Sequence, residues 1–203
     1  MQPFRARKRI SSIGGVWAAM LIALLWAAPA WAAQGDARAT LLLGTANFSI
    51  GSGSTTGTSF GFHWGYELED RLTWSLGATF TSTSGQISQG GQTYDISANT
   101  NTLSTGLTYG FDLGPNSIVL PFAGGGLNYV SYDIDFNYPT SEVGRVSGAS
   151  PGVFGLAGLE FRVSRNFDMF VQYVLSASSI EAQDGSTVTL LAGGLLLSFR
   201  LTI

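Results

Sequence analysis

Large apolar side chains recur at every second position over long parts of this sequence. Between residues 60 and 68 the chain reads Phe-Gly-Phe-His-Trp-Gly-Tyr-Glu-Leu, so bulky apolar residues alternate with small or polar ones. A β-strand points successive side chains to opposite faces, so this alternation indicates strands that are apolar on one face. It recurs in residues 72–80, 103–111, 159–163 and 195–203, and more loosely in residues 40–50, 117–131 and 167–177. The sequence therefore predicts an all-β fold of eight strands.

The connections between these segments differ in length in a regular order. The short ones cover residues 68–71, 112–116 and 164–166, and the long ones cover residues 51–57, 82–98, 132–150 and 178–186. The long connections are rich in Gly, Ser, Thr and Asn. In a transmembrane barrel, short turns face the periplasm and long loops face the outside. Four long and three short connections predict an eight-stranded antiparallel up-and-down barrel with both termini on the periplasmic side.

Composition bears on whether the barrel lies in a membrane or in water. A soluble lipocalin-like barrel would have an apolar interior and a charged exterior, but only 11% of this chain is charged, against about 25% in soluble domains. The non-aromatic face is mostly Gly, Ser and Thr, which suits the lining of a narrow lumen better than a solvated surface. Aromatic residues near the short turns are expected to form the lower aromatic girdle at the membrane boundary. They are Trp64, Tyr66, Trp74, Tyr109, Phe111, Phe161 and Phe167.

The N-terminal segment has the features of a secretory signal peptide. A basic stretch with Arg5 and Arg9 precedes an apolar run over residues 13–28, and Ala30-Trp31-Ala32 offers the small residues that signal peptidase accepts. We expect cleavage before Ala33, with an uncleaved anchor as the alternative. Residues 33–203, the expected barrel domain, carry six basic and thirteen acidic residues, a net charge of −7, and no lysine. Because nucleic-acid binding needs a basic surface, the sequence predicts no nucleic-acid partner.

Several kinds of chemistry are excluded or disfavoured by residue type. The chain has no cysteine, which excludes disulfides, thiolate metal sites, a cysteine nucleophile and a lipoprotein anchor. Its single histidine, His63, cannot form a multi-histidine zinc site. Asp133, Asp135 and Glu142 have oxygen ligands suited to calcium, but they lack a calcium-loop motif and fit a solvated acidic loop better. The sequence predicts no cofactor and no metal.

A polar cluster is expected in the periplasmic half of the lumen. Its members face the small-residue side of the strands and lie near short turns or the C-terminus: His63, Glu67, Glu160, Arg162, Asp168 and Arg200. Isolated charges in a narrow lumen are costly, so we expect ion pairing there. The cluster would act as a plug, or alternatively set the selectivity of a small conduit. Phe154 and Phe170 are candidates for side chains that point into the lumen and block it further.

The hairpins at residues 65–72 and 158–166 resemble the strand-turn-strand units of small outer-membrane barrels of the opacity and OmpX type. The C-terminal strand, ending Ser-Phe-Arg-Leu-Thr-Ile, is similar to the signal read by the barrel insertion machinery, with Ile203 where Phe is common in that family. The resemblance covers residues 33–203 and implies a barrel in the outer membrane of a Gram-negative bacterium. Its implied partners are outer-membrane lipid, lipopolysaccharide and the insertion machinery.

The function that these observations favour is non-enzymatic. The barrel would anchor surface-exposed loops that meet a ligand outside the cell or serve the structure of the envelope. One alternative is a narrow channel for small or hydrophobic solutes. A second is a lipid A-modifying barrel enzyme in which His63 activates a serine. In the barrel deacylases that this chain resembles in size, histidine and serine lie close together near the C-terminal strand, where this sequence has no histidine.

Overall fold

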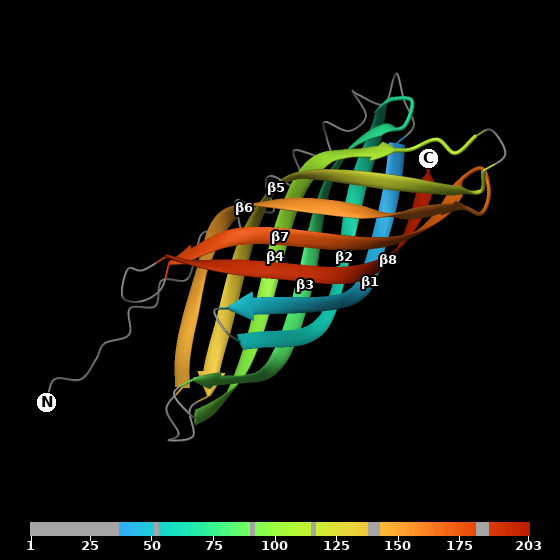
Figure 1. Cartoon of the computed structure of the whole chain (residues 1–203). Coiled ribbons are helices and arrows are strands. Elements are labelled where there is room, and N and C mark those ends of the chain that lie inside the picture. Colours follow the sequence, from blue (N-terminus) through green and yellow to red (C-terminus); the bar gives the residue numbers. More distant parts are fainter. Residues whose placement is uncertain (1–36, 51–52, 90–91, 115–116, 138–142, 182–186) are drawn as a thin grey trace, which may run out of the picture. The chain divides into compact units, whose positions relative to one another are not determined.

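The protein is a closed barrel of eight antiparallel strands in which each strand pairs with its neighbours along the chain and β1 pairs with β8 (Figure 1). The computed structural model describes residues 37–50, 53–89, 92–114, 117–137, 143–181 and 187–203. The strands are β1 (Ala37–Ile50), β2 (Gly53–Glu69), β3 (Leu72–Gln89), β4 (Gln92–Gly110), β5 (Val119–Asn137), β6 (Val143–Arg162), β7 (Phe167–Glu181) and β8 (Thr187–Thr202).

The predicted fold class and strand number are confirmed. The expected signal peptide, residues 1–32, lies outside the described residues. Within the described ranges, no helix has the length and hydropathy of a membrane span.

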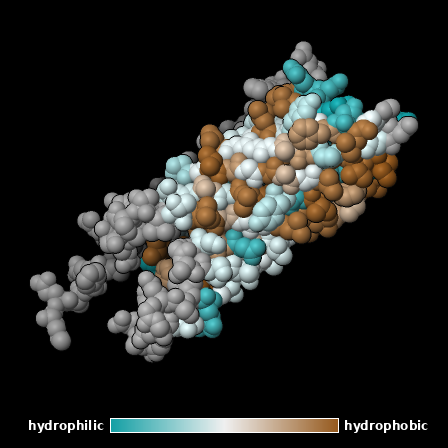
Figure 2. Space-filling model, viewed as in Figure 1, coloured by the Kyte–Doolittle hydropathy of each residue, from teal (hydrophilic) through white to brown (hydrophobic). Residues whose placement is uncertain are grey.

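The bulky apolar face of the strands points outward, as the sequence predicts. Phe60, Leu127 and Leu195 have 55%, 64% and 54% of their surface exposed, whereas Leu42 and Ser198 on the opposite face are each 1% exposed. Figure 2 shows hydrophobic residues gathered over the part of the barrel near the C-terminal end of β8, and a paler surface toward the far end. An apolar exterior of this kind is what a transmembrane barrel presents to lipid.

Three of the four connections expected to be long loops, residues 51–57, 82–98 and 132–150, are mostly strand, and the described part of the fourth, residues 178–181, belongs to β7. The segment expected to form a loop at residues 82–98 is built from the end of β3 and the start of β4, and residues 132–150 contribute similarly to β5 and β6. β6 has 20 residues. At about 3.3 Å per residue and a tilt of about 40°, such a strand rises about 50 Å, roughly twice the height of an apolar band.

In the parts of the strands that extend beyond the apolar band, polar residues face outward and apolar residues face inward. Asn99 and Asp133 point outward, whereas their neighbours Ala98 and Ile134 point inward and are 2% and 1% exposed. We call the inward cluster at this end the apolar cap; it comprises Ala46, Phe48, Ile96, Ala98, Tyr132, Ile134 and Leu190. The prediction of loops was wrong here because the outward residues of these strands are polar, as residues in loops commonly are. The apolar residues between them pack inside the barrel and keep the chain in strand.

Two neighbouring strands separate at this outer end. β5 and β6 remain paired as far as Asn137 and Val143, but β6 and β7 are paired only as far as Gly152 and Ser178. Figure 1 shows β6 running away from the tip formed by β7 and β8. Pro151 comes directly before Gly152 of that last β6–β7 pair, and proline has no N–H to donate to a neighbouring strand. We call this separation between residues 143–151 of β6 and the end of β7 the notch.

The opposite end of the barrel is closed by compact turns. The β2–β3 turn places Arg71 in the left-handed region, with φ of 72°, and its backbone N–H donates to the Glu67 carboxylate at 3.2 Å. The Arg71 guanidinium reaches the next turn and binds Asp112 at 2.5 Å. The backbone N–H of Gly114 donates to the same Asp112 side chain at 2.8 Å. These contacts tie neighbouring turns together at the end that carries the chain termini of the barrel.

Candidate functional site

The inner end of the lumen, next to the compact turns, holds a group of ion pairs centred on Arg200. Asp168 on β7 is the register partner of Arg200 on β8. Its Oδ2 atom accepts hydrogen bonds from Arg200 Nη2 at 2.9 Å and Nε at 3.1 Å. Arg200 Nη2 also lies 2.8 Å from Glu160 Oε1 on β6, and the guanidinium carbon is 4.3 Å from the centre of the Phe170 ring. Asp168 and Arg200 are 9% and 8% exposed, so their charges are neutralised inside the barrel.

A second ion pair joins Arg38 on β1 to Glu67 on β2. Arg38 Nη2 donates to Glu67 Oε2, and Nη1 donates to Thr73 Oγ1 at 3.2 Å. Arg38 was not predicted to face the lumen because the periodic pattern of the sequence begins at residue 40. In the structure β1 starts at Ala37 and pairs Arg38 with Gly65 and Thr202, which places the guanidinium inside the lumen. The strand thus starts three residues before the periodic pattern, and Ala37, Arg38 and Ala39 carry no sequence signal of it.

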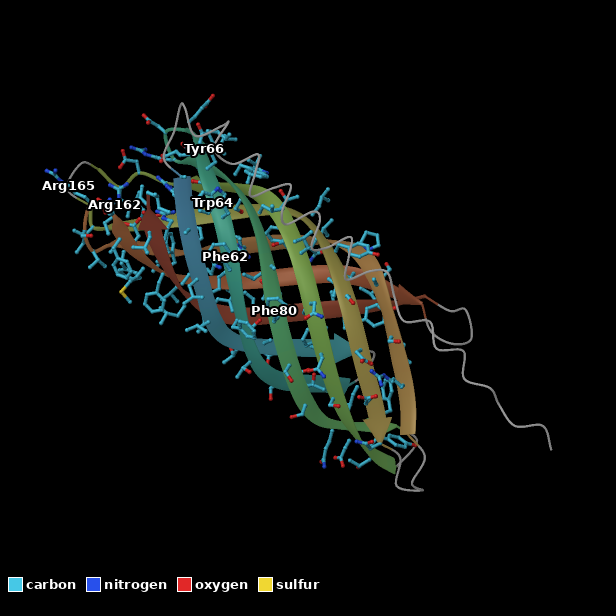
Figure 3. All side chains as sticks on the ribbon, turned by 180° about the vertical axis from the view of Figure 1, so that it is seen from behind. Phe62, Trp64, Tyr66, Phe80, Arg162 and Arg165 are labelled. Carbon is cyan, nitrogen blue, oxygen red and sulfur yellow. The ribbon has the colours of Figure 1, made fainter. Side chains whose placement is uncertain are left out.

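Arg162 is the most peripheral member of the predicted polar cluster. It is the register partner of Asp168, but its Nε atom lies 3.9 Å from Glu160 Oε1 and its side chain is 54% exposed. Figure 3 shows Arg162 beside Arg165 at the turn end of the barrel. The structure therefore brings Glu160, Asp168 and Arg200 together, and it leaves Arg162 at the mouth.

His63 lies farther inside the lumen, with its ring over the β3 strand. Gly77 is its register partner, and a Cβ atom at Gly77 would overlap the imidazole ring. Its Nε2 atom is buried and has no hydrogen-bond partner within the described part of the chain. Among the described residues, no serine therefore forms a hydrogen bond with His63 Nε2.

Two cavities follow one another along the lumen. The inner cavity has a volume of about 120 Å³ and is lined by the ion-paired residues and by Ser75, Thr108 and Ser198. The outer cavity has a volume of about 100 Å³ and lies beneath the apolar cap. Four residues line both cavities and form the wall between them, which we call the septum: Leu42, His63, Leu156 and Gln172. Phe170 lines the inner cavity and Phe154 the outer one, so both rings occupy the lumen.

The residues of the expected lower girdle lie on the outward face of their strands or in the adjoining turns. Figure 3 shows Trp64 and Tyr66 toward the turn end, with Phe62 and Phe80 farther along the barrel. Trp74 Nε1 donates to the lipid-facing Thr105 hydroxyl at 3.0 Å, so neither polar group is left unpaired on the apolar exterior. Tyr109 packs edge-on against Phe111 at 5.5 Å between ring centres. Phe167 stacks with Phe199 at 6.3 Å, and Phe161 is 37% exposed. The girdle role remains a prediction.

An aromatic pair farther from the turns was not singled out from the sequence. Phe60 on β2 and Phe80 on β3 are register partners, and their rings stack at 5.0 Å between centres with an interplanar angle of 22°. The next outward residues on these strands are Thr58 and Ser82, so the pair marks the outer boundary of the apolar band here. Register between strands, which periodicity alone does not give, would have revealed it.

Two of the three acidic residues considered as calcium ligands, Asp133 and Asp135, lie in ion pairs with Arg145. The Arg145 guanidinium on β6 donates to both carboxylate oxygens of Asp133 on β5, and its Nε atom lies 3.7 Å from Asp135 Oδ1. Glu142 lies outside the described residues. Among those that are described, no group of three His, Cys, Asp or Glu residues is arranged to hold a metal ion.

Comparisons with known proteins agree with this architecture. The profile of the family described as "Outer membrane protein beta-barrel domain" matches residues 18–199. Neisserial surface protein A has a similar structure, with a TM-score of 0.57 and 18% identity over 82% of this chain and 97% of that one. The outer membrane protein OprG from Pseudomonas aeruginosa has a TM-score of 0.52 and 14% identity over 83% and 96%.

The outer membrane enzyme PagL is also among the similar structures, with a TM-score of 0.49 and 16% identity over 80% of this chain and 99% of that one. Comparison with curated protein sequences gave no match. At these identities the structural likenesses concern the fold alone, whereas the family profile spans most of the chain. This chain belongs to the outer membrane protein beta-barrel domain family and is a protein of the Gram-negative outer membrane.

Proposed function

We propose that this barrel acts without catalysis, as an anchor that holds a polar surface outside the cell. The observation that carries the proposal is the inversion of polarity along β3 to β6. Nearer the turns, the strands are apolar outside; beyond the Phe60–Phe80 pair they are polar outside and enclose the apolar cap. A polar exterior over an apolar core is the arrangement that water stabilises.

The outward face of this extension is hydrogen-bonded across strands. Arg145 binds Asp133 across the β5–β6 pair, and Gln86 donates to Asp95 across β3 and β4 at 2.9 Å. Backbone hydrogen bonds between paired strands, together with these side-chain contacts, give this surface a defined shape that a long loop would lack. The proposed surface is therefore the strand extension itself, and its partner would be a polar molecule outside the cell or the sugars of lipopolysaccharide.

The absence of cysteine from the sequence allows a direct test. Single-cysteine variants at Asn99 on the outward face and at Ala98 on the inward face of β4 would be exposed to a membrane-impermeant maleimide on intact cells. We expect Asn99→Cys to react and Ala98→Cys not to react. Arg165→Cys on the turn between β6 and β7 should react only after the outer membrane is permeabilised. Labelling of Arg165→Cys on intact cells would mean that the barrel has the opposite orientation, and the proposal would fail.

The non-enzymatic part of the proposal needs a separate measurement. Lipid A from cells with and without the protein would be compared by mass spectrometry, with His63→Ala as the matched variant. Identical lipid A masses in all three strains are expected. A mass change that disappears in His63→Ala would establish the enzyme alternative instead.

A further inference from the structure

Part of the β6 edge lies next to no other strand. β6 pairs with β5 as far as Val143, but its pairing with β7 ends at Gly152, so residues 143–151 border the notch (Figure 1). The backbone of a strand carries N–H and C=O groups along both edges. On the notch side, these groups have no neighbouring strand within the part of the chain that the structure describes. An edge of this kind is a template for pairing with another chain.

The hydrogen bonds at the turn end show which residues of β6 direct their backbone groups to the notch. The Arg162 N–H donates to the carbonyl of Ile118, which precedes β5, at 3.0 Å, whereas the Val163 N–H donates to Phe167 on β7 at 3.2 Å. Backbone groups of successive residues point to opposite edges of a strand, and the register of β6 with both neighbours has no shift. Even-numbered residues of β6 therefore use their backbone groups toward β5, and odd-numbered residues direct theirs toward β7 or the notch.

A proline marks the place where pairing with β7 ends. Pro151 is odd-numbered, so the N–H that it lacks would have pointed toward β7, and its carbonyl accepts a hydrogen bond from the Ser150 hydroxyl at 3.0 Å. Ser147 and Ala149, farther along the same edge, keep both backbone groups, and no described residue forms a backbone hydrogen bond with them on this side. Pro151 thus ends one ladder, and the capacity of the edge to form another begins at Ala149.

The side chains at this edge do not block it. Natural proteins commonly guard a free edge with charged side chains, especially lysine. Residues 143–151 contain one charged residue, Arg145, and its guanidinium binds Asp133 on β5, the strand on the side away from the notch. The outward-facing Ser147 and Ala149 are small and uncharged. A strand can therefore approach to hydrogen-bonding distance along this edge.

The two faces beside this edge differ in polarity, which determines the side chains that an added strand would carry. On the inward face, Val146 packs against the apolar cap. The Tyr132 ring of that cap lies over Gly148, where a Cβ atom would be 2.6 Å from the phenol oxygen. On the outward face lie Ser147 and Ala149, both exposed. A strand with apolar side chains inward and polar ones outward would continue both faces.

We propose that residues 143–149 of β6 bind an extended segment of another polypeptide outside the cell, which pairs antiparallel with β6 in line with β7. Only an extended backbone presents donors and acceptors at the spacing of a strand edge. The antiparallel direction is that of β7 on the same edge. A second copy in the same membrane cannot supply β6 for this pairing, because two identical edges that pair antiparallel are related by a two-fold axis that turns the barrels in opposite directions. The inference rests on the proposed outward position of the strand extension and names its partner as a peptide of alternating polarity.

The test uses two isomeric peptides that differ only in which edge can donate hydrogen bonds. Each is a fluorescent octapeptide of alternating Thr and Val, N-methylated either at every Val or at every Thr, and its binding to the full barrel in lipid nanodiscs would be measured by anisotropy. In an antiparallel pair, directly opposed residues share a face, so the Thr residues beside Ser147 and Ala149 must donate while Val faces the apolar cap. The isomer methylated at Thr should therefore bind at least about tenfold more weakly.

Variants of Ser147 separate the backbone contribution from that of the side chain. Ser147→Pro removes one notch-facing N–H, as Pro151 does naturally, and should weaken binding of the isomer methylated at Val roughly three- to tenfold. Ser147→Ala removes only the hydroxyl group and should leave the affinity within about twofold. Ala149→Pro should repeat the effect of Ser147→Pro at the next notch-facing residue. A heat-dependent gel mobility shift would verify that each barrel is closed.

Equal affinities of the two isomers, or tighter binding of the isomer methylated at Thr, would overturn the proposal, and so would equal affinities of closed Ser147→Pro and Ser147→Ala barrels. A wild-type dimer in detergent that dissociates in Ser147→Pro would assign the edge to a second copy and overturn it as well. Binding to the isolated barrel does not depend on which side of the membrane the edge faces. Failure of this test is therefore distinct from failure of the cysteine labelling on intact cells.

Discussion

Arg200 and Asp168 face each other across the β7–β8 pair and form a buried ion pair, with Arg200 Nη2 2.9 Å from Asp168 Oδ2. The same guanidinium nitrogen lies 2.8 Å from Glu160 Oε1, so one arginine pairs with two carboxylates from two other strands. Removal of one partner from such a group leaves charge buried without compensation. The lumen is thus stabilised across three neighbouring strands by a single side chain.

The first prediction concerns Arg200→Ala. Asp168 and Glu160 would lose their shared partner, and we expect the free energy of unfolding to fall by about 3–5 kcal/mol. Urea unfolding of the refolded barrel in lipid vesicles would measure it. Arg165→Ala, in the turn between β6 and β7, is the matched control and should change stability by less than about 0.5 kcal/mol. Equal midpoints for the two variants would contradict the assignment of Arg200 as the centre of the cluster.

A second prediction follows from the His63 ring over Gly77. Gly77→Ala should destabilise the barrel by about 1–3 kcal/mol, because the added methyl group overlaps the imidazole. His63→Ala should relieve most of that cost, so the double variant should be more stable than the sum of the two single changes predicts. Strict additivity in this double-mutant cycle would mean that the ring does not occupy the space over Gly77.

The third prediction concerns the part of the barrel beyond the apolar band. Ile134 is 1% exposed inside the apolar cap, so Ile134→Ala should cost about 2–5 kcal/mol, as in a soluble core. The neighbouring outward position provides the comparison, since Asn99→Ala should have an effect within about 0.5 kcal/mol. Both would be measured by urea unfolding. A cost for Ile134→Ala as small as that for Asn99→Ala would indicate that the outer strands do not enclose a packed core.

The fourth prediction is a pH dependence at the inner turns. The Gly114 N–H and the Arg71 guanidinium hold the pKa of Asp112 below its usual range. A lowered pKa in the folded state means that the ionised carboxylate stabilises the fold above the pKa of the unfolded chain. This contribution is lost as the pH falls through the lower, folded value. The carboxyl ¹³C resonance of Asp112 should therefore titrate below that of an unstructured aspartate.

Arg71→Ala is the variant that isolates the side-chain contribution to this shift. Its Asp112 resonance should titrate at a higher pH than in the wild type, while the Gly114 hydrogen bond keeps it below the ordinary value. Because Asp112 is exposed, the effect on global stability should be small. An unchanged titration in Arg71→Ala would show that Arg71 does not contact Asp112 in solution.

The sequence predicted part of the membership of the polar cluster and little of its pairing. Period-two alternation placed Glu160, Asp168 and Arg200 on the lumen face, and their nearness to turns placed them at one end. Which arginine meets Asp168 depends on side-chain reach across the barrel, and Arg162, its register partner, is directed to the mouth instead. Arg38 was missed because three polar or small residues at a strand end give no periodic signal.

At the end of the barrel away from the turns, the sequence failed to predict the strands themselves. Gly, Ser, Thr and Asn in residues 82–98 have the composition of a loop, yet Ile96 and Ala98 pack inside the barrel. Local composition measures how easily a segment is solvated, and it does not register that inward neighbours from β1, β5 and β8 complete a core. The notch is likewise invisible in sequence apart from Pro151, since it is a property of how far two strands remain paired.

The sequence by itself determined the strand number, the barrel class, the lipid-facing surface and the lumen-facing position of Glu160, Asp168 and Arg200. These follow from alternation, because a strand assigns each side chain to one of two faces whatever its partners are. Only the tertiary structure decided the ion-pair network, the division of the lumen by the septum, the apolar cap and the notch. Each of these depends on strand register and on side chains meeting across the barrel, which bring together residues that are distant in the chain and carry no local signal of their contact.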